Sequence, residues 1–495
     1  MRTGLVAVVL FAALAASAHA AQPAAVVVLV PPFDPSTYAQ GAVGLLVPGA
    51  GEMVSREGAL AALVRGRTKK SLLGGVPGGK PVIALSTHPG AVTIYVSLPR
   101  PGTHRNDRRY PIAIVGGGYH GILESSATRI RGLVSIADVA PTALGKRRIT
   151  STPDADAPVE LRRLDARLRV QNASRNWAVA ILSFAVIIGS LLTLLTRSNR
   201  VGRAALLAAP LALGLTVALS AAGVTRTGTL LAVQAALTVG LSAAGGFLLP
   251  GRRVVGIAFA TLIAAYLVVL AAVPEWPALA AIGPNPSEGG RFYGSSNLTT
   301  SVLLTVALFA GASFGLRSVL PVALLAIFTV GWSRAGADGG GLVVFVAAFA
   351  ALAVRLAWGR LTTRTAALTV AGSVALGLAL VGFDAATGGH SHVTHKVGQG
   401  PGALLDEFGN RLHISAERLA TSWHAALVFA IAAAALAVLA THPPRFPAGD
   451  ALLFGIVVSL LVNDSPSDVA SGGAISYGVL WAYERIRSRP CVAEP

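Results

Sequence analysis

Three short motifs carry the side chains in this sequence that are most capable of chemistry. In the first, GPNPSEGGRFYGSSN, Arg291, Tyr293 and Asn297 stand just before an apolar stretch, and Glu288 could pair with Arg291. A guanidinium held in such a loop can bind a phosphate or a carboxylate through two parallel hydrogen bonds. The same residues would equally suit an interfacial belt of arginine and aromatic side chains that anchors a helix.

The second and third motifs, GADGGG and NDSPSD, add carboxylates and a further arginine. Arg334 and Asp338 flank a predicted outer turn, and the glycine run 339–341 that follows would let the backbone approach a ligand or a neighbouring helix closely. Asp464 ends an apolar run, where a carboxylate is costly unless it is paired or functional, and a pair with Arg334 or Arg291 would satisfy both conditions. Ion pairing and helix packing are the alternative explanation. The predicted substrate-binding residues are Arg291, Tyr293, Asn297, Arg334, Asp338 and Asn463, and Asp464 is a candidate catalytic base.

A long polar joint, residues 383–423, holds the remaining candidates. The histidines of residues 390–395, spaced H-x-H-x-x-H, could offer imidazoles to zinc, but the surrounding glycines favour a solvated loop. Residues 403–420 predict an amphipathic helix that lies in the headgroup region of a membrane. On this helix His413 is a second candidate for acid/base catalysis. We predict neither a bound metal nor a cofactor.

The scaffold that positions these motifs is predicted to be a membrane bundle. The chain has 495 residues, 53% of them hydrophobic, and from Trp177 onward apolar segments recur between short basic or glycine-rich joints. The predicted spans are 177–195, 204–222, 230–249, 254–273, 300–316, 319–332, 342–358, 366–381, 425–439 and 451–462, with 469–483 as an eleventh span or a re-entrant helix. The fold class is therefore an α-helical polytopic membrane bundle of about 10 to 11 spans, preceded by a small α/β extracytoplasmic domain.

Charge and processing signals orient the bundle. Residues 1–20 run from Arg2 through an apolar stretch to Ala18-His19-Ala20, the layout of a secretory signal peptide. Arginines gather on alternate joints, which the positive-inside rule places in the cytoplasm. We expect an exported domain at 21–152, a polar and partly helical linker at 153–176, a multi-pass domain at 177–483 and a cytoplasmic tail at 484–495. The expected location is the cell membrane.

The exported part is strongly basic and has no cysteine. Residues 21–175 contain 20 Lys and Arg against 10 Asp and Glu, and the single Cys491 lies near the C-terminus. Such a surface attracts anionic headgroups, phosphorylated lipids or acidic glycans, and outside the cytoplasm it does not meet nucleic acid. Because no disulfide can form within the chain, the domain must be stabilised by its own apolar core.

Short apolar runs bounded by Gly, Pro and Asn or Asp predict buried strands in the exported domain. Strands that are apolar throughout and mixed with helices favour an α/β sheet. Ser55 is expected to cap a helix that continues to Arg65. The predicted strands are 25–30, 43–47, 81–86, 92–97, 111–115 and 133–136.

Part of this domain resembles a known superfamily. The segment YPIAIVGGGYHGILESSATRIRGLVSIADVAPTALG, residues 110–145, resembles the C-terminal strand and the D-x-A-P-T-x-L helix start of alkaline phosphatases and sulfatases. VPPFDP, residues 30–35, falls where the family's first metal-bearing strand would lie. The resemblance implies that Asp138, Pro141 and Thr142 sit at the turn into a helix, where the Asp side chain accepts backbone amides.

The sequence departs from that superfamily in its chemistry. The family uses a nucleophilic Ser or Thr with several Asp and His ligands, whereas this domain offers His88, His104 and His120 with few aspartates and is less than half the usual length. The resemblance therefore implies a degenerate domain rather than an active phosphatase. The three membrane motifs resemble signatures of an uncharacterised family of bacterial polytopic membrane proteins that carry such phosphatase-like domains.

The predicted function follows from the location of these groups. We expect a cell-envelope membrane protein that recognises an anionic or lipid-linked substrate, such as a lipid-linked phosphate or glycan, at its outer face without metal-phosphatase activity. A secondary transporter or flippase is one alternative, because glycine- and proline-interrupted spans occur where helices unwind around a substrate. A non-catalytic envelope scaffold is the other. The charges lie at the ends of the spans, which favours an outer-surface site over a conduction path.

Overall fold

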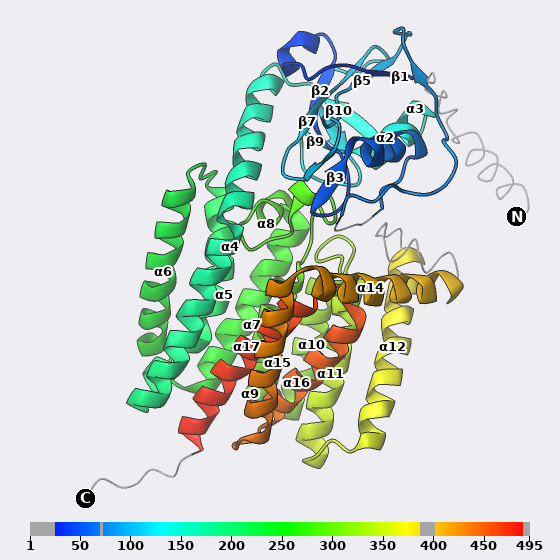
Figure 1. The fold of residues 1–495 in the computed structure, drawn as a ribbon. Helices are drawn as coiled ribbons and strands as arrows, with labels where there is room; N and C mark the ends of the chain where they lie inside the picture. Colours follow the sequence, from blue (N-terminus) through cyan, green and yellow to red (C-terminus); the bar gives the residue numbers. More distant parts are fainter. Residues whose placement is uncertain (1–24, 70–72, 387–400, 489–495) are drawn as a thin grey trace, which may run out of the picture.

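An α/β domain stands on one end of a helical bundle in this protein (Figure 1). The computed structural model describes residues 25–69, 73–386 and 401–488. The predicted signal peptide, the histidine motif at 390–395 and the end of the predicted tail lie outside the described residues.

The α/β domain is built on a mixed sheet whose strand order is β10-β8-β2-β7-β5-β1-β4, with β9 paired to β2 beside β8. Strand β2 lies antiparallel to β7 and parallel to β8 and β9, so it is the centre of the sheet. Its six residues are all buried. The strands are β1 (Val26–Leu29), β2 (Ala42–Val47), β4 (Leu85–Ser86), β5 (Thr93–Val96), β7 (Tyr110–Val115), β8 (Gly121–Ser125), β9 (Leu133–Ser135) and β10 (Ile149–Thr152), and β3 (Met53–Ser55) pairs with β6 (Thr103–Arg105) in a separate ribbon.

Most of the apolar runs predicted as strands are strands. The exception is the segment 81–86, which pairs only at Leu85–Ser86, and the sequence analysis missed β3, β6, β8 and β10. Strand β10 was missed because its residues Ile149–Thr152 are mostly polar and lie at the edge of the sheet, where an apolar run is not required. The predicted helix is confirmed as α2 (Arg56–Arg65), since the Ser55 hydroxyl accepts from the Gly58 amide at 2.9 Å.

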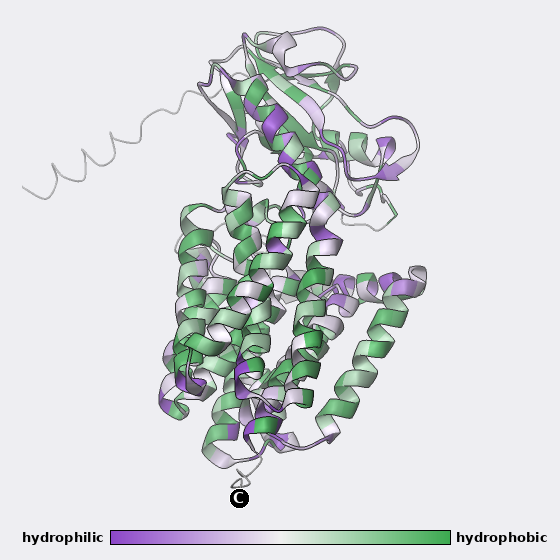
Figure 2. Ribbon diagram, turned by 90° about the vertical axis from the view of Figure 1, so that its left-hand side faces the viewer, coloured by the Kyte–Doolittle hydropathy of each residue, from purple (hydrophilic) through white to green (hydrophobic). Residues whose placement is uncertain are grey.

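One helix, α4 (Ala157–Thr196), belongs to both parts of the molecule. The segment predicted as a polar linker forms its first half, and Leu161, Leu164 and Leu168 pack there against Val43 and Leu45 of β2. The second half enters the bundle without a break (Figure 2). The domain is therefore joined to the bundle by a rigid helix rather than by a flexible linker.

The bundle contains apolar helices that run toward and away from the α/β domain (Figure 1). Residues 469–483, predicted as a span or a re-entrant helix, lie in one uninterrupted helix, α17. The predicted amphipathic helix is confirmed as α14, which lies across the end of the bundle that faces the α/β domain. The helices are α5 (Asn199–Ala221), α6 (Thr227–Leu248), α7 (Gly251–Ala272), α9 (Asn297–Ser313), α10 (Leu316–Gly331), α11 (Gly339–Trp358), α12 (Thr363–Ala386), α14 (Pro401–Thr421), α15 (Trp423–Thr441), α16 (Pro447–Val462) and α17 (Pro466–Arg487).

Seven of these helices, α4, α5, α6, α7, α11, α12 and α15, are long and apolar enough to cross a membrane. The apolar helices α9, α10 and α16 are shorter. The chain is accordingly a multi-pass membrane protein. At the end of the bundle away from the α/β domain, Asp450 is held between Arg355, at 2.6 Å, and Arg445, which fixes α11 to α16.

A buried ion pair ties the α/β domain to α4. The side chain of Arg109 is only 2% exposed, and its guanidinium lies 2.7 Å from the Asp165 carboxylate. The same guanidinium donates to the Ser287 hydroxyl at 3.1 Å, in the segment that precedes α9. Three segments that are distant in the sequence are thus joined through one side chain.

Replacing Arg109 with alanine should loosen this docking. The change removes the buried partner of the Asp165 carboxylate, which keeps its pair with the exposed Arg169, and it removes the donor to the Ser287 hydroxyl. We therefore expect a loss of roughly 1 to 3 kcal/mol in docking free energy. Hydrogen exchange of residues 273–296 in the solubilised protein measures the effect. The control is Arg163→Ala, because Arg163 is 68% exposed and pairs with Glu160 of the same helix. Equal exchange in the two variants would show that the Arg109 pair does not hold the domain.

Candidate functional site

The first sequence motif lies where the α/β domain meets the bundle. We call residues 273–296 the junction loop; it follows α7 and contains the short helix α8 (Glu275–Ala278). The buried Asn106 side chain donates to the Gly51 and Glu288 carbonyls at 3.1 and 3.0 Å, and the Gly51 amide donates to the same Glu288 carbonyl at 2.8 Å. The backbone of the motif at Glu288 therefore contacts the α/β domain and helps to hold the two parts of the protein together.

Gly289 shows how tight this junction is. Its φ is +65°, and a Cβ at this position would lie 2.0 Å from the Gly49 carbonyl oxygen of the α/β domain. Only glycine meets both conditions without displacing the domain.

Tyr293, predicted to bind substrate, is occupied by a contact within the protein. The Arg129 guanidinium of the α/β domain lies 4.0 Å from the centre of the Tyr293 ring. The same arginine donates to the Ser333 carbonyl at 2.9 Å, so it also reaches the loop between α10 and α11. A cation over the ring stabilises the docked domain, and this face of Tyr293 is closed to a ligand.

Arg291 and Asp338 lie together. The Asp338 side chain is 1% exposed and lies 3.4 Å from the Arg291 guanidinium, which also donates to the Ser295 carbonyl. Asp338 caps α11 by accepting from the Gly341 amide at 3.1 Å, and it accepts from Thr300 of α9 at 3.3 Å. The buried carboxylate is therefore fully engaged, whereas Arg291 retains 35% of its side-chain exposure.

Two of the pairs that the sequence allowed, Glu288 with Arg291 and Arg334 with Asp464, are not found among the described residues. Glu288 accepts from Asn285 at 2.8 Å rather than pairing with Arg291. Arg334 does not pair with Asp338; it is exposed, and it makes no hydrogen bond or ion pair within the described ranges. Asn297 is half-buried at the first turn of α9. The roles of Arg334 and Asn297 in substrate binding remain predictions.

Asn463 is a packing residue. Its side-chain amide donates to the Ser459 hydroxyl at 2.7 Å, and its backbone carbonyl accepts from the Ser415 hydroxyl of α14 at 3.2 Å. A Cβ at Gly340 would lie 2.7 Å from the Asn463 side-chain oxygen, so the glycine run allows α11 and α16 to approach closely, as the sequence predicted. Arg411 of α14 donates to the Val462 carbonyl at 3.0 Å and thereby caps α16.

Charged side chains from five segments interact electrostatically near the first turn of α17. We call Glu52, Arg175, Glu288, Arg418, Asp464 and Asp468 the junction cluster. Asp468 is exposed in the first turn of α17, and the charges of Arg175, Arg418, Asp464 and Glu52 act on it. Arg418 of α14 lies 3.8 Å from Glu52 of the α/β domain, and Arg175 of α4 donates to the Gly283 carbonyl at 2.6 Å.

Of the two predicted acid/base residues, Asp464 lies in this cluster and His413 lies outside it. Asp464 is half-buried and interacts electrostatically with Arg291. This agrees with the expected proximity of Asp464 to Arg291, although the closer partner of Arg291 is Asp338. His413 is exposed on α14, outside the cluster.

Burial raises the pKa of Glu288. The positive charges of Arg175 and Arg418 and the hydrogen bond from Asn285 act in the opposite direction, and the nearby Glu52 carboxylate raises the pKa further. A carboxyl group of this kind retains its proton above the ordinary range of glutamate, so it can donate a hydrogen bond or a proton.

The mixture of charges defines what the cluster can bind. Guanidinium groups bind phosphate oxygens, and carboxylates accept hydrogen bonds from hydroxyl groups such as those of sugars. No group of three His, Cys, Asp or Glu that could hold a metal is found within residues 25–69, 73–386 and 401–488. The chemistry available here is ionic and hydrogen-bonding recognition, with carboxyl groups for proton transfer.

Asp138 and Thr142, in the segment 110–145, make hydrogen bonds within the α/β domain. Asp138 precedes the short helix α3 (Val139–Ala143), and its carboxylate was expected to accept from the amides of that helix. It accepts from the Ser125 hydroxyl and the Ala127 amide instead. Burial raises the pKa of Asp138, and these hydrogen bonds oppose the rise. Thr142 links the Asp138 carbonyl to the Ile149 amide.

No family model matches this chain, and neither the curated proteins nor the solved structures contain a match to it.

Sequence reasoning missed the residues that complete the cluster. Arg175 lies in the predicted linker 153–176, and Asp468 ends the NDSPSD motif; neither residue was predicted to belong to a site. Position along a helix is the signal that could have identified Asp468, because an acidic residue in the first turn after Pro466 faces the positive end of the helix dipole. Arg175, in contrast, acts electrostatically on Asp468, which is about 290 residues away in the chain, so no local pattern could have identified it.

Alanine at Gly289 should destabilise the junction. The alanine Cβ would clash with the Gly49 carbonyl in addition to the strain of a positive φ. We therefore expect the free energy of unfolding to fall by about 1 to 3 kcal/mol more than strain at a positive φ alone would cause. Gly223→Ala is the matched control, because Gly223 has φ +66° with no atom within 4 Å of its Cβ position. Thermal unfolding of the two variants measures the difference, and equal melting temperatures would contradict a tight junction.

Glu288→Gln should remove part of the pH dependence of docking. Because the folded pKa is raised, the docked state holds a proton that the undocked carboxyl releases, so this stabilisation is present at low pH and falls as pH rises. Hydrogen exchange of the junction loop between roughly pH 4 and 7 should accelerate more in the wild type than in this variant. Glu57→Gln, which removes an exposed carboxyl, is the control. An unchanged pH profile in Glu288→Gln would contradict the assignment.

Proposed function

We propose that this protein binds a phosphate-bearing lipid or lipid-linked glycan of the cell envelope at the junction cluster. The observation that carries the proposal is the convergence of Arg175, Arg418 and the exposed Asp468 at the end of the bundle that faces the α/β domain. Arg291, on which the charge of the cluster residue Asp464 acts, extends the same charged region toward α9.

The proposed topology places this site at the outer face of the cytoplasmic membrane. We assign eleven crossings, namely the seven long apolar helices, the shorter helices α9, α10 and α16, and α17. The arginines at the joints α4–α5, α6–α7, α9–α10 and α11–α12 then all lie on the cytoplasmic side, in accordance with the positive-inside rule. The α/β domain lies outside and the C-terminus inside.

The geometry of α14 supports this assignment. The helix lies across the domain-facing end of the bundle, with Arg418 directed to Glu52 and Ile414 buried. An amphipathic helix in this orientation is typical of the interface between headgroups and acyl chains. A lipid headgroup at the level of α14 would therefore reach the junction cluster without leaving the membrane.

We further propose that the α/β domain does not act as a metal-dependent phosphatase. His88, His104 and His120 are all exposed, and Asp34 is engaged as a cap that accepts from Ser36. The role of the domain in this proposal is to supply Glu52 and the basic surface around the bound headgroup.

Arginine removal at the cluster should weaken the binding of a lipid phosphate. In native mass spectrometry of the full chain with undecaprenyl phosphate, Arg418→Ala and Arg291→Ala should each reduce affinity about tenfold, because each removes a charged hydrogen-bond donor. The uncharged undecaprenol is the reference ligand. The matched variant is Arg163→Ala, which removes the same charge from the exposed surface.

Two results would contradict the proposal. One is equal affinity for undecaprenyl phosphate and undecaprenol in the wild type. The other is an affinity in Arg418→Ala and Arg291→Ala that matches Arg163→Ala.

A further inference from the structure

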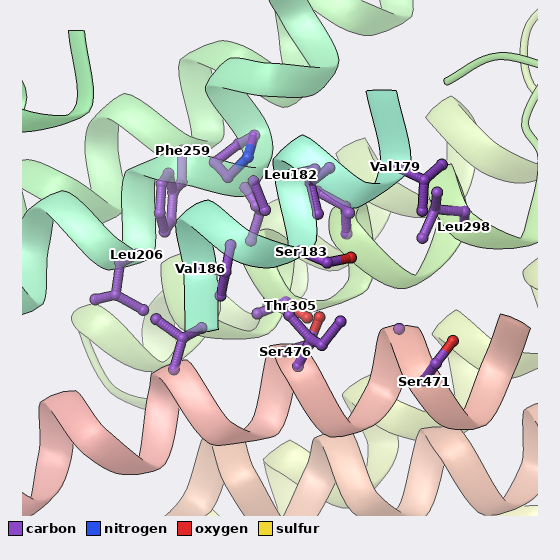
Figure 3. Close-up of a pocket in the computed structure, with 17 residues that line it drawn as sticks. Val179, Leu182, Ser183, Val186, Leu206, Phe259, Leu298, Thr305, Ser471 and Ser476 are labelled. Carbon is purple, nitrogen blue, oxygen red and sulfur yellow. The ribbon is translucent and has the colours of Figure 1, made fainter. Parts of the chain in front are cut away.

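A pocket opens inside the bundle between α4, α5, α7, α9 and α17 (Figure 3). Leu182 and Val186 of α4 face Ser476 of α17 across it, and Phe259 of α7 and Thr305 of α9 complete the wall. The centre of a water-sized sphere can move within about 40 Å³ of this pocket, which is open on one side.

The lining of this pocket is largely hydrocarbon. Its polar groups are hydroxyls, including those of Ser183, Thr305, Ser471 and Ser476. These hydroxyls can bond to carbonyls of their own helices, as Thr305 does to the Ser301 carbonyl at 3.0 Å. The lining hydroxyls therefore do not require hydrogen bonds from a ligand, and the pocket suits an apolar ligand.

The pocket is accessible from the side of the bundle. Val179 and Ser183 of α4 and Ile475 of α17 line it and are only half-buried. In a membrane-spanning bundle the medium at that side is the hydrocarbon of lipid chains rather than water.

Helix geometry places the pocket directly beneath the junction cluster. Arg175 precedes the pocket residue Val179 by four positions on α4, and Asp468 precedes Ser471 by three on α17. Residues at these spacings lie on the same face of a helix, one turn apart. A molecule that reaches from the cluster into the pocket thus has to cross only about one turn, roughly 5 Å.

We propose that this pocket receives the hydrocarbon chain of the phosphate-bearing lipid whose headgroup is held by the junction cluster. The inference rests on the proposed function of the cluster. It adds the hydrocarbon chain of the lipid to the headgroup as a second determinant of specificity. The site then selects ligands that carry both an anionic headgroup and a long apolar chain.

Two of the lining residues are small or lack a backbone donor. A Cβ at Gly472 would lie 3.3 Å from the Ser301 Cβ, so α17 and α9 pack closely at this level. Pro210, which lies inside α5, also lines the pocket and cannot donate a helical hydrogen bond. Bulkier side chains at these lining positions would occupy part of the pocket.

The test is a substitution that fills the pocket without touching the cluster. Ser183→Trp places an indole in the pocket, and Phe184→Trp is the control, because Phe184 is the next residue of α4 and is 63% exposed. Affinities for undecaprenyl phosphate and for the short-chain ethyl phosphate, whose two carbons cannot span the turn between the cluster and the pocket, are measured by native mass spectrometry of the full chain. Ser183→Trp should weaken the long-chain ligand at least about tenfold and leave the short-chain ligand unchanged.

The outcomes separate this inference from the proposal on which it rests. If Ser183→Trp binds the long-chain ligand like Phe184→Trp while Arg418→Ala does not, the headgroup site stands and the chain site is overturned. If Arg418→Ala also binds normally, both are overturned. Ser476→Leu fills the same pocket from α17, and it should reproduce the loss if Ser183→Trp proves unfolded.

Discussion

The helix α4 is the constraint on which the rest of the structure depends. Leu161, Leu164 and Leu168 bury its first half against the sheet of the α/β domain, whereas Leu182 and Val186 bury its second half in the bundle. Because a continuous helix resists bending, these two sets of contacts fix the position of the domain relative to the bundle. The junction loop, Arg109 and Arg129 then need only complete a docking geometry that α4 has already set.

Rigid docking explains why so many charged groups gather at one place. Residues of the α/β domain, α4, the junction loop, α14 and α17 meet at the domain-facing end of the bundle. Some of their charges neutralise one another, as in the Arg418 and Glu52 pair, while Asp468 remains exposed. Such an arrangement suits a ligand that carries both phosphate and hydroxyl groups better than a simple anion, since the arginines and the carboxylates each find a partner.

The helical scaffold could be predicted from the sequence because apolar runs of sufficient length leave few alternatives to a membrane helix. The amphipathic α14 and the capped α2 were predictable for similar, local reasons. The contacts of the site were not. Asn106 and Glu288, for example, are 182 residues apart, and no local pattern joins them. Tyr293, Asp338 and Asn463 have the residue types of a binding site, yet their partners lie within the protein.

The most direct test of this account is an electron cryomicroscopy structure of the full chain in a lipid nanodisc that contains undecaprenyl phosphate. The account predicts phosphate density within hydrogen-bonding distance of Arg418 or Arg175, beside the N-terminus of α17. Lipid phosphate density found only elsewhere on the bundle, with the junction cluster filled by water alone, would contradict it.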